Sequence, residues 1–173
     1  MNKNKILFSL LLASIFSFVS LSAQVKESFN IQTTLVSNGY KAIKMNRLVS
    51  GHLHITCEIN GVMGDFILDS GANSTIIDNA SEQKFRIDSE KGDKTAGGAG
   101  AVNLKTSQSK GNSINLDGLI ISDFTLILMS LDHVNKALSK HGVPRMDGVI
   151  GADIFALYNA VIDYKSMCLY LKK

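Results

Sequence analysis

The segment FILDSGANSTII, residues 66–77, constrains the fold of this chain more than any other stretch. Its apolar flanks, Phe66–Leu68 and Ile76–Ile77, predict two buried strands. Between them Asp69 ends an apolar run, and a hydroxyl, a glycine and an alanine follow directly. A carboxylate at the end of a buried strand is costly unless something uses it. Asp-Ser-Gly is also a common surface turn, but the apolar flanks argue against an exposed turn here.

The surrounding sequence predicts a mostly β domain. HLHITCEI, residues 52–59, alternates polar and apolar residues, which is typical of a strand with one buried face. The dipeptide Asn60-Gly61 is typical of the turn that closes a hairpin. At 173 residues the chain is long enough for one domain with a real core.

Later segments predict further strands and a few short helices. In chain order these are a mobile polar loop at residues 89–103, two strands within 113–131 that join near Ser122-Asp123, a short amphipathic helix at 132–142, a strand ending at Ile150, a helix through Tyr158 and a hairpin turning at Lys165-Ser166.

A second informative segment, DGVIGADIF, begins at Asp147, about 80 residues after the first. Its apolar residues Val149 and Ile150 run into Gly151, and a helix is predicted to follow. A glycine at this position lets the strand pass close to another backbone. By itself the segment also fits an ordinary strand-to-helix turn, so both interpretations stay open.

Together, in this order and spacing, the two segments resemble the retropepsin-like aspartic proteases, and the resemblance covers residues 42–171. In that family a hairpin leads into Asp-(Thr/Ser)-Gly-Ala, a glycine-bearing flap follows, and an apolar-apolar-Gly segment crosses behind the catalytic loop. The resemblance implies an all-β fold. This is a retropepsin-like (acid protease) closed β-barrel with short helices and one Asp-Ser-Gly-Ala lobe per chain.

The resemblance also implies functions for individual residues. Asp69 would be the catalytic aspartate, with a Ser70 hydroxyl that braces the loops. The implied active-site loop is Ser70, Gly71 and Ala72, the implied flap and substrate-binding residues are Gly97, Gly98 and Gly100, and the implied loop-supporting residues are Val149, Ile150 and Gly151.

The sequence departs from viral members of this family at two positions. Those members commonly carry an acidic residue after the alanine and an arginine after the apolar-apolar-Gly segment. This chain has Asn73 and Ala152 there. Ionic bracing of the viral kind is therefore not expected, although Asn73 and Asp153 could form a neutral substitute.

Peptide hydrolysis by this route needs two aspartates about 3 Å apart that share one proton. The ionised one takes a proton from the attacking water, and the protonated one hydrogen-bonds the carbonyl oxygen. No metal or other cofactor is required. The chain has no second Asp-(Ser/Thr)-Gly, since Asp117-Gly118 and Asp147-Gly148 lack the hydroxyl and are better interpreted as turns. The sequence therefore predicts a homodimer, with a peptide or protein as substrate.

A second class of function stays open, a non-catalytic extracytoplasmic peptide-binding module on the same fold. A pure binder has no need for an intact Asp-Ser-Gly-Ala, so the motif favours an aspartic endopeptidase. A serine hydrolase has no support, because the chain lacks Gly-x-Ser-x-Gly.

The N-terminus predicts export. Lys3 and Lys5 precede an apolar run and the small-residue sequence LSAQ, which is typical of a signal peptide cleaved after Ala23. The apolar run is short for a membrane span, so no stable membrane anchor is expected after cleavage. The predicted organisation is a signal peptide at 1–23, an extended N-terminal arm at 24–41 and a retropepsin-like domain at 42–173 of a periplasmic or secreted protein.

Charge gives no reason to propose nucleic acid as a partner. Without residues 1–23, sixteen Lys and Arg residues remain against 15 Asp and Glu, with no basic cluster. Outside the cytoplasm Cys57 and Cys168 could form a disulfide or pack as two separate thiols. His52 and His54 would share a strand face, where they are expected to be solvated rather than bound to a metal.

Overall fold

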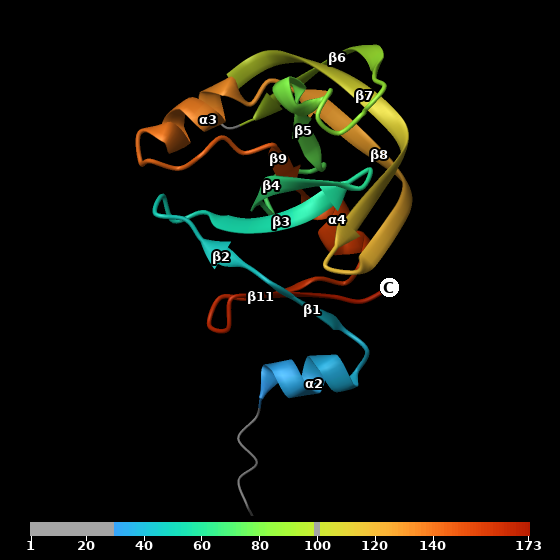
Figure 1. Cartoon of the computed structure of the whole chain (residues 1–173), viewed down its shortest axis with the longest axis vertical. Helices are drawn as coiled ribbons and strands as arrows, with labels where there is room; N and C mark the ends of the chain where they lie inside the picture. Colours follow the sequence, from blue (N-terminus) through green and yellow to red (C-terminus); the bar gives the residue numbers. More distant parts are fainter. Residues whose placement is uncertain (1–29, 99–100) are drawn as a thin grey trace, which may run out of the picture. The chain divides into compact units, whose positions relative to one another are not determined.

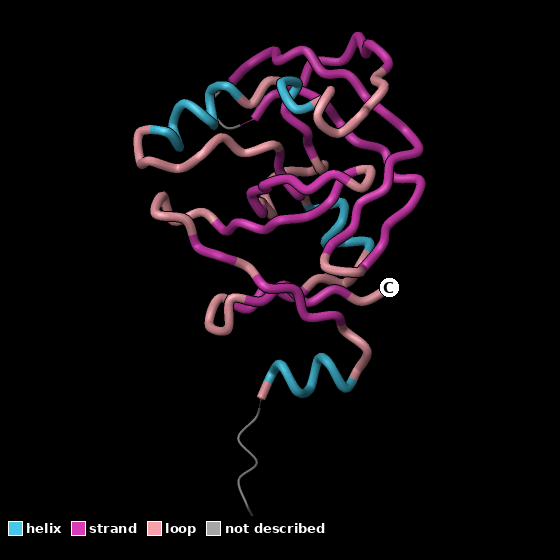
Figure 2. Tube along the Cα trace, viewed as in Figure 1, coloured by secondary structure: helices cyan, strands magenta, loops and turns pink. Residues whose placement is uncertain are grey.

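Strands are the main regular secondary structure in the computed structural model, which describes residues 30–98 and 101–173. The strands are β1 (Lys41–Lys44), β2 (Asn46–Arg47), β3 (Leu53–Ile59), β4 (Val62–Leu68), β5 (Ile76–Asp78), β6 (Glu90–Gly98), β7 (Ala101–Leu116), β8 (Leu119–Met129), β9 (Gly148–Ile150), β10 (Val161–Asp163) and β11 (Cys168–Leu171). The helices are α2 (Ile31–Ser37), the 3₁₀ helix η2 (Asn79–Ser81), α3 (Asp132–Ser139) and α4 (Ala152–Leu157). Figure 2 shows how the short helices interrupt the strands.

Six of the strands close into a barrel. Hydrogen-bonded neighbours run in the order β3-β4-β9-β5-β8-β7, and β7 pairs back with β3 at Glu58↔Asn115 and Ile59↔Ile114. Closure leaves no free edge among these six strands. The long antiparallel pair β7 and β8 curves along one side of the barrel (Figure 1). The predicted all-β closed barrel with short helices is confirmed.

The continuous apolar run before Asp69 follows from burial of β4 on both faces. Phe66 and Leu68 belong to the larger apolar cluster, which takes residues from all six barrel strands. Ile67 points to the other face and packs in a second cluster with Val149 of β9 and Leu138 of α3. A strand covered on both sides needs apolar residues at consecutive positions rather than at alternate ones.

β2 pairs with β3 and β6 with β7 beside the barrel, and three further strands form a small separate sheet in the order β1-β11-β10. β11 lies in the centre, where Leu169 pairs with Ile43 on one side and Ile162 on the other. The predicted C-terminal hairpin turning at Lys165-Ser166 is confirmed by the antiparallel pairing of β10 with β11. Both edges of β11 are therefore paired within the described chain.

Two-residue turns close the hairpins of the barrel. Asn60 and Gly61, with φ of 50° and 77°, join β3 to β4 as predicted. Asp117 and Gly118, with φ of 50° and 87°, join β7 to β8. The prediction that these two strands join near Ser122-Asp123 is wrong. Asp123 lies inside β8 at an irregularity of the β7–β8 pairing, where its φ of 54° resembles that of a turn residue.

The prediction of a mobile loop at residues 89–103 is also wrong for the described part. β6 and β7 pair antiparallel across this segment, from Glu90↔Gln108 to Gly98↔Ala101. Backbone hydrogen bonds to a long neighbouring strand hold a sequence that has no strand-like alternation of polar and apolar residues. Residues 99–100 lie outside the described residues.

The predicted extended arm at 24–41 contains a helix, α2, instead of continuous extended chain. The Asn30 side chain accepts hydrogen bonds from the N–H groups of Gln32 and Thr33, at 3.0 and 3.3 Å, and so caps the first turn. Leu35–Lys173 form one compact unit. The predicted signal peptide, 1–23, lies outside the described residues, and the predicted domain boundaries stay a prediction.

Across residues 30–98 and 101–173, no helix has both the length and the apolar character needed to cross a membrane.

Candidate active site

Asp69 stands directly after β4 on a loop that the backbone holds in place. Its N–H donates to the carbonyl of Ile150 at 3.1 Å, which continues the parallel pairing of β4 with β9. The Asp69 carboxylate accepts the Gly71 N–H at 2.8 Å, and the Asp69 carbonyl accepts the Ala72 N–H at 3.2 Å. The strand before it is buried, but Asp69, Ser70 and Gly71 are exposed in the single chain. A rigid turn therefore presents the carboxylate at the surface.

The end of β9 packs against this loop because Gly151 has no side chain. A Cβ on Gly151 would lie 2.5 Å from the carbonyl oxygen of Ser74 and 2.8 Å from that of Ala72. Directly after it, the N–H of Ala152 donates to the Ala72 carbonyl at 2.7 Å. β9 runs parallel to β4 and antiparallel to β5, so it passes between the two strands that flank the loop. The structure thus brings Val149, Ile150 and Gly151 beside Asp69.

A carboxylate and a hydroxyl join the far end of the loop to α4. Asp153 accepts the Thr75 N–H at 2.7 Å and the Thr75 hydroxyl at 2.8 Å. The Thr75 oxygen in turn accepts the Gly151 N–H at 3.2 Å. Asp153 therefore bonds Thr75 rather than Asn73, which is exposed, and the suggested pairing of Asn73 with Asp153 is wrong. Asn73 points into solvent, whereas Thr75 is buried next to Gly151.

Asp147 fastens the start of β9 to the rest of the barrel. Its backbone N–H donates to the Asp65 carbonyl at 2.8 Å, and its side chain accepts the Asp65 N–H at 2.9 Å. The same side chain accepts hydrogen bonds from Ser81 at 2.8 Å and Lys84 at 2.6 Å. Asp147-Gly148 is therefore not the turn that the sequence predicted, because Gly148 is already part of a buried strand.

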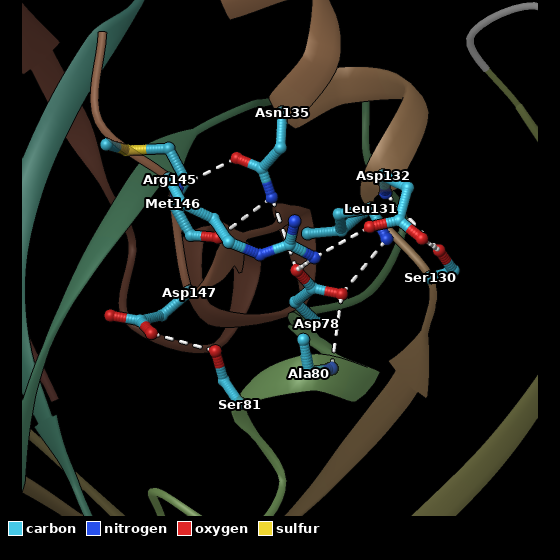
Figure 3. A network of polar contacts seen from close by, with 10 residues as sticks. All are labelled: Asp78, Ala80, Ser81, Ser130, Leu131, Asp132, Asn135, Arg145, Met146 and Asp147. Atoms are coloured by element: carbon cyan, nitrogen blue, oxygen red, sulfur yellow. Dashed lines mark hydrogen bonds and ion pairs between the residues drawn. The ribbon is translucent and has the colours of Figure 1, made fainter. Parts of the chain in front are cut away.

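A buried carboxylate, Asp78, ties α3 to the chain that leads into β9 (Figure 3). Asp78 accepts hydrogen bonds from the Leu131 N–H and the Asn135 side chain, each at 3.2 Å, and from Arg145. Asn135 also pairs with both backbone groups of Met146. The network fixes residues 145–147, so it sets where β9 begins.

The pKa of Asp147 makes the stability of this anchor depend on pH. Burial by itself raises the pKa of the carboxyl, but hydrogen bonds from Lys84, the Asp65 N–H and Ser81 outweigh it and hold the pKa below its usual range. Because the folded-state pKa is the lower one, the stabilisation is complete above the unfolded value of about 4. It is lost as the pH falls through the folded pKa.

Replacing Lys84 with methionine is expected to lower the free energy of unfolding at pH 7 by about 1 to 2 kcal/mol, because a partly buried carboxylate loses a charged donor. The loss of stability between pH 7 and pH 3 should become smaller than in wild type, since the pKa of Asp147 moves back up. Urea unfolding of wild type and Lys84→Met at pH 7 and pH 3, at one protein concentration, measures both changes in the free energy of unfolding. Lys41→Met is the control, because Lys41 meets Asp117 at 4.0 Å between exposed side chains. An unchanged acid dependence in Lys84→Met would contradict the assignment.

Two of the three glycines predicted to form a flap lie on β6, which pairs with β7 as a hairpin. Gly97 and Gly98 are the last two residues of β6, and Gly98 pairs with Ala101 of β7. Gly100 lies outside the described residues. A flap needs a hairpin of this kind, and the function of these glycines stays a prediction.

The cysteines and His54 occupy structural positions. Cys57 and Cys168 are both free and buried, so they are the two separate thiols rather than a disulfide. Burial, followed by the nearby negative charge of Asp147, raises the pKa of Cys57, which keeps it a neutral thiol. His54 is buried and hydrogen-bonded to Asp65 at 2.8 Å, so the prediction that it is solvated is wrong. Within the described chain no three His, Cys, Asp or Glu residues cluster as a metal site.

Sequence reasoning missed the partners that hold the site. Thr75 lies inside the segment FILDSGANSTII, residues 66–77, but its partner Asp153 is 78 residues away. The one local signal of this pair is that Thr75, a hydroxyl residue, directly precedes β5 and that Asp153, an acidic residue, lies in the first turn of α4. Apart from the N-cap bond that Asp78 accepts from the Ala80 N–H at 3.4 Å, the network of Asp147 and Asp78 has no local signal, because its other donors come from four separate stretches of chain.

Comparisons with known proteins identify the family and the fold of this chain. A model of the aspartyl protease family matches residues 55–154, more than half of the chain. No curated protein matches the sequence. Among solved structures, a retropepsin-like aspartic protease from Rickettsia conorii has 20% sequence identity and a TM-score of 0.52, covering 77% of this chain and 89% of that one.

Two further solved structures are similar over shorter parts of the chain. The retroviral protease-like domain of Ddi1 from Leishmania major has 22% identity and a TM-score of 0.49 over 69% of this chain and 87% of that one. EIAV protease in complex with the inhibitor HBY-793 has 19% identity and a TM-score of 0.46 over 61% and 86%. The Rickettsia fold agrees with the barrel, and the family model shows that the chain belongs to the aspartyl protease family, with a retropepsin-like fold.

Proposed function

We propose that this protein is an aspartic endopeptidase that hydrolyses peptide bonds between the Asp69 carboxylates of two copies. The observation that carries the proposal is the Asp69 loop itself. An exposed carboxylate is held rigidly by Gly71 and by the end of β9, in a chain of the aspartyl protease family. An exposed, fixed aspartate can meet its symmetry mate across a two-fold axis.

The mechanism follows from two such carboxylates sharing one proton. The ionised one removes a proton from a water molecule as the water attacks the peptide carbonyl. The protonated one donates a hydrogen bond to the carbonyl oxygen as negative charge develops there. Only the singly protonated pair can perform both steps, so hydrolysis should have an optimum at acidic pH and decline on either side. Peptides or proteins are the substrates.

The protein is proposed to act after export, in the periplasm or outside the cell, without a stable membrane anchor. The support is the N-terminal order of Lys3 and Lys5, an apolar run and a small-residue end at Ala23. Mass spectrometry of the protein recovered from the producing cells tests this, because export predicts a chain that begins at Gln24. An N-terminus that retains the apolar run would contradict it.

Hydrolysis of a peptide library is expected to depend on the concentration of dimer, because one chain supplies one aspartate. Specific activity should fall on dilution below the dissociation constant. Mixing three Asp69→Asn chains with each wild-type chain should lower the activity per wild-type chain about fourfold, because random pairing leaves roughly one wild-type chain in four with a wild-type partner. Initial rates across the dilution and mixing series, with sedimentation at each concentration, measure both effects.

The control for the mixing series is the same excess of Asp163→Asn chains, which should not lower the activity per wild-type chain. This substitution alters an exposed turn far along the chain from Asp69. Constant specific activity at concentrations where sedimentation finds only monomer would overturn the dimer. Peptide binding without hydrolysis under any of these conditions would favour the non-catalytic peptide-binding module instead.

A further inference from the structure

We infer that Asp153 is a positioning residue that holds the Asp69 loop in its working geometry inside a single chain, before a second copy binds. The inference rests on the proposed function of Asp69. Under this inference, activity has two separate requirements. The chain's own hydrogen bonds hold the Asp69 loop in place, and the partner supplies only the second carboxylate.

Both oxygens of Asp153 are used on the far end of the loop. One accepts the Thr75 N–H at 2.7 Å, and the other accepts the Thr75 hydroxyl at 2.8 Å and the Ile154 N–H at 2.8 Å. The Thr75 oxygen then accepts the Gly151 N–H at 3.2 Å. Thr75 has no exposed surface, so water cannot replace these partners.

The near end and the middle of the loop are tied to the same stretch of chain. Asp69 donates to the Ile150 carbonyl at 3.1 Å, and Ala152 donates to the Ala72 carbonyl at 2.7 Å. Residues 150–153 therefore contact the loop at its start, its middle and its end. Every one of these bonds lies within one chain, so none of them requires a dimer.

The hydrogen bonds between Asp153 and Thr75 require a carboxylate at position 153. Thr75 presents two donors, its N–H and its hydroxyl, and an ionised carboxylate offers an acceptor to each. An asparagine has one acceptor oxygen and would turn an NH₂ group toward a buried donor. Asp153→Asn thus leaves the size of the side chain nearly unchanged and removes one acceptor, which releases Thr75 and then Gly151.

The first test is hydrogen exchange measured by mass spectrometry on peptides covering residues 69–76 and 151–155 of the full chain. In wild type these peptides should be protected equally at concentrations above and below dimer formation. Asp153→Asn should accelerate their exchange at least about tenfold, while peptides from β3 and β8 exchange as before. Thr75→Val should behave similarly, and Thr75→Ser, which keeps the hydroxyl, should restore protection.

Asp163→Asn is the matched control, because Asp163 also accepts one backbone N–H, at 2.9 Å, and one hydroxyl, at 2.7 Å. In hydrolysis, Asp153→Asn should lower kcat about tenfold or more with KM within about twofold, since the carboxylates are misplaced rather than removed. A change in KM alone would contradict a positioning effect.

Two results would overturn the inference. One is unchanged loop exchange in both Asp153→Asn and Thr75→Val. The other is a wild-type loop that exchanges freely in the monomer and becomes protected only in the dimer. Hydrogen exchange is measured without any substrate. A chain that hydrolyses no peptide would refute the proposed function, and the exchange data would still decide whether Asp153 organises the Asp69 loop.

Discussion

Asp69→Asn is expected to lower kcat for peptide hydrolysis by at least about 10³-fold, because the change removes both the base that activates water and the acid that polarises the carbonyl. The fold should not change, since Asp69 is exposed and the asparagine oxygen can still accept the Gly71 N–H, which donates to the carboxylate at 2.8 Å in wild type. Initial rates on a peptide that the wild type cleaves, together with urea unfolding, measure both properties.

Asp163→Asn is the control for this substitution and should keep wild-type activity. An Asp69→Asn protein that still binds the peptide but does not cleave it would locate the defect in the chemical step. Hydrolysis within tenfold of wild type would show that another group activates the water, and the catalytic assignment of Asp69 would fall.

Gly151→Ala is expected to lower the free energy of unfolding by about 3 kcal/mol or more, because overpacking against backbone cannot be relieved by turning a side chain. The new Cβ would lie 2.5 Å from the Ser74 carbonyl oxygen and 2.8 Å from that of Ala72. Both atoms belong to the Asp69 loop, so the variant that folds should also lose most of its activity. Urea unfolding at fixed protein concentration and initial rates test the two effects.

Gly51→Ala separates the steric effect from the general cost of replacing a glycine. Gly51 has a φ of +87°, and a Cβ there meets nothing within 4 Å. Gly51→Ala should therefore lower the free energy of unfolding only by the backbone strain, about 1 to 2 kcal/mol. If Gly151→Ala costs no more than Gly51→Ala, then the close approach of β9 to the Asp69 loop is not what requires glycine at this position.

Local patterns in the sequence were sufficient for the elements that carry the site. Consecutive apolar residues at Phe66–Leu68 and at Val149–Ile150 predict strands covered on both faces, because each position of such a strand meets a core. Asn60-Gly61 predicts the hairpin turn, because both residues tolerate a positive φ. The position of Asp69 after one run and of Gly151 after the other was enough to indicate the family, which the comparisons then confirmed.

The same reasoning failed where a long neighbouring strand or a distant donor decides the outcome. Residues 90–98 look like part of a loop because they lack alternation of polar and apolar residues, and they form β6 because β7 offers them a ladder of hydrogen bonds. Asp123 looks like a turn residue, and it lies inside β8 because its partner strand continues past it. His54 looks like one of the solvated residues of its strand, and it is buried beside Asp65 of the next strand.

What the sequence by itself determined is the two apolar strands of the site, the hairpin turn at Asn60-Gly61, and that a carboxylate ends one of the strands, because these depend on neighbours within a few residues. Only the tertiary structure decided what holds that carboxylate in place. Thr75 meets Asp153, and Asp147 meets Lys84, across 78 and 63 residues of chain. Such pairs arise from the register in which β9 passes between β4 and β5 and from the packing of η2 and α4 around it. No local pattern of residues encodes that register.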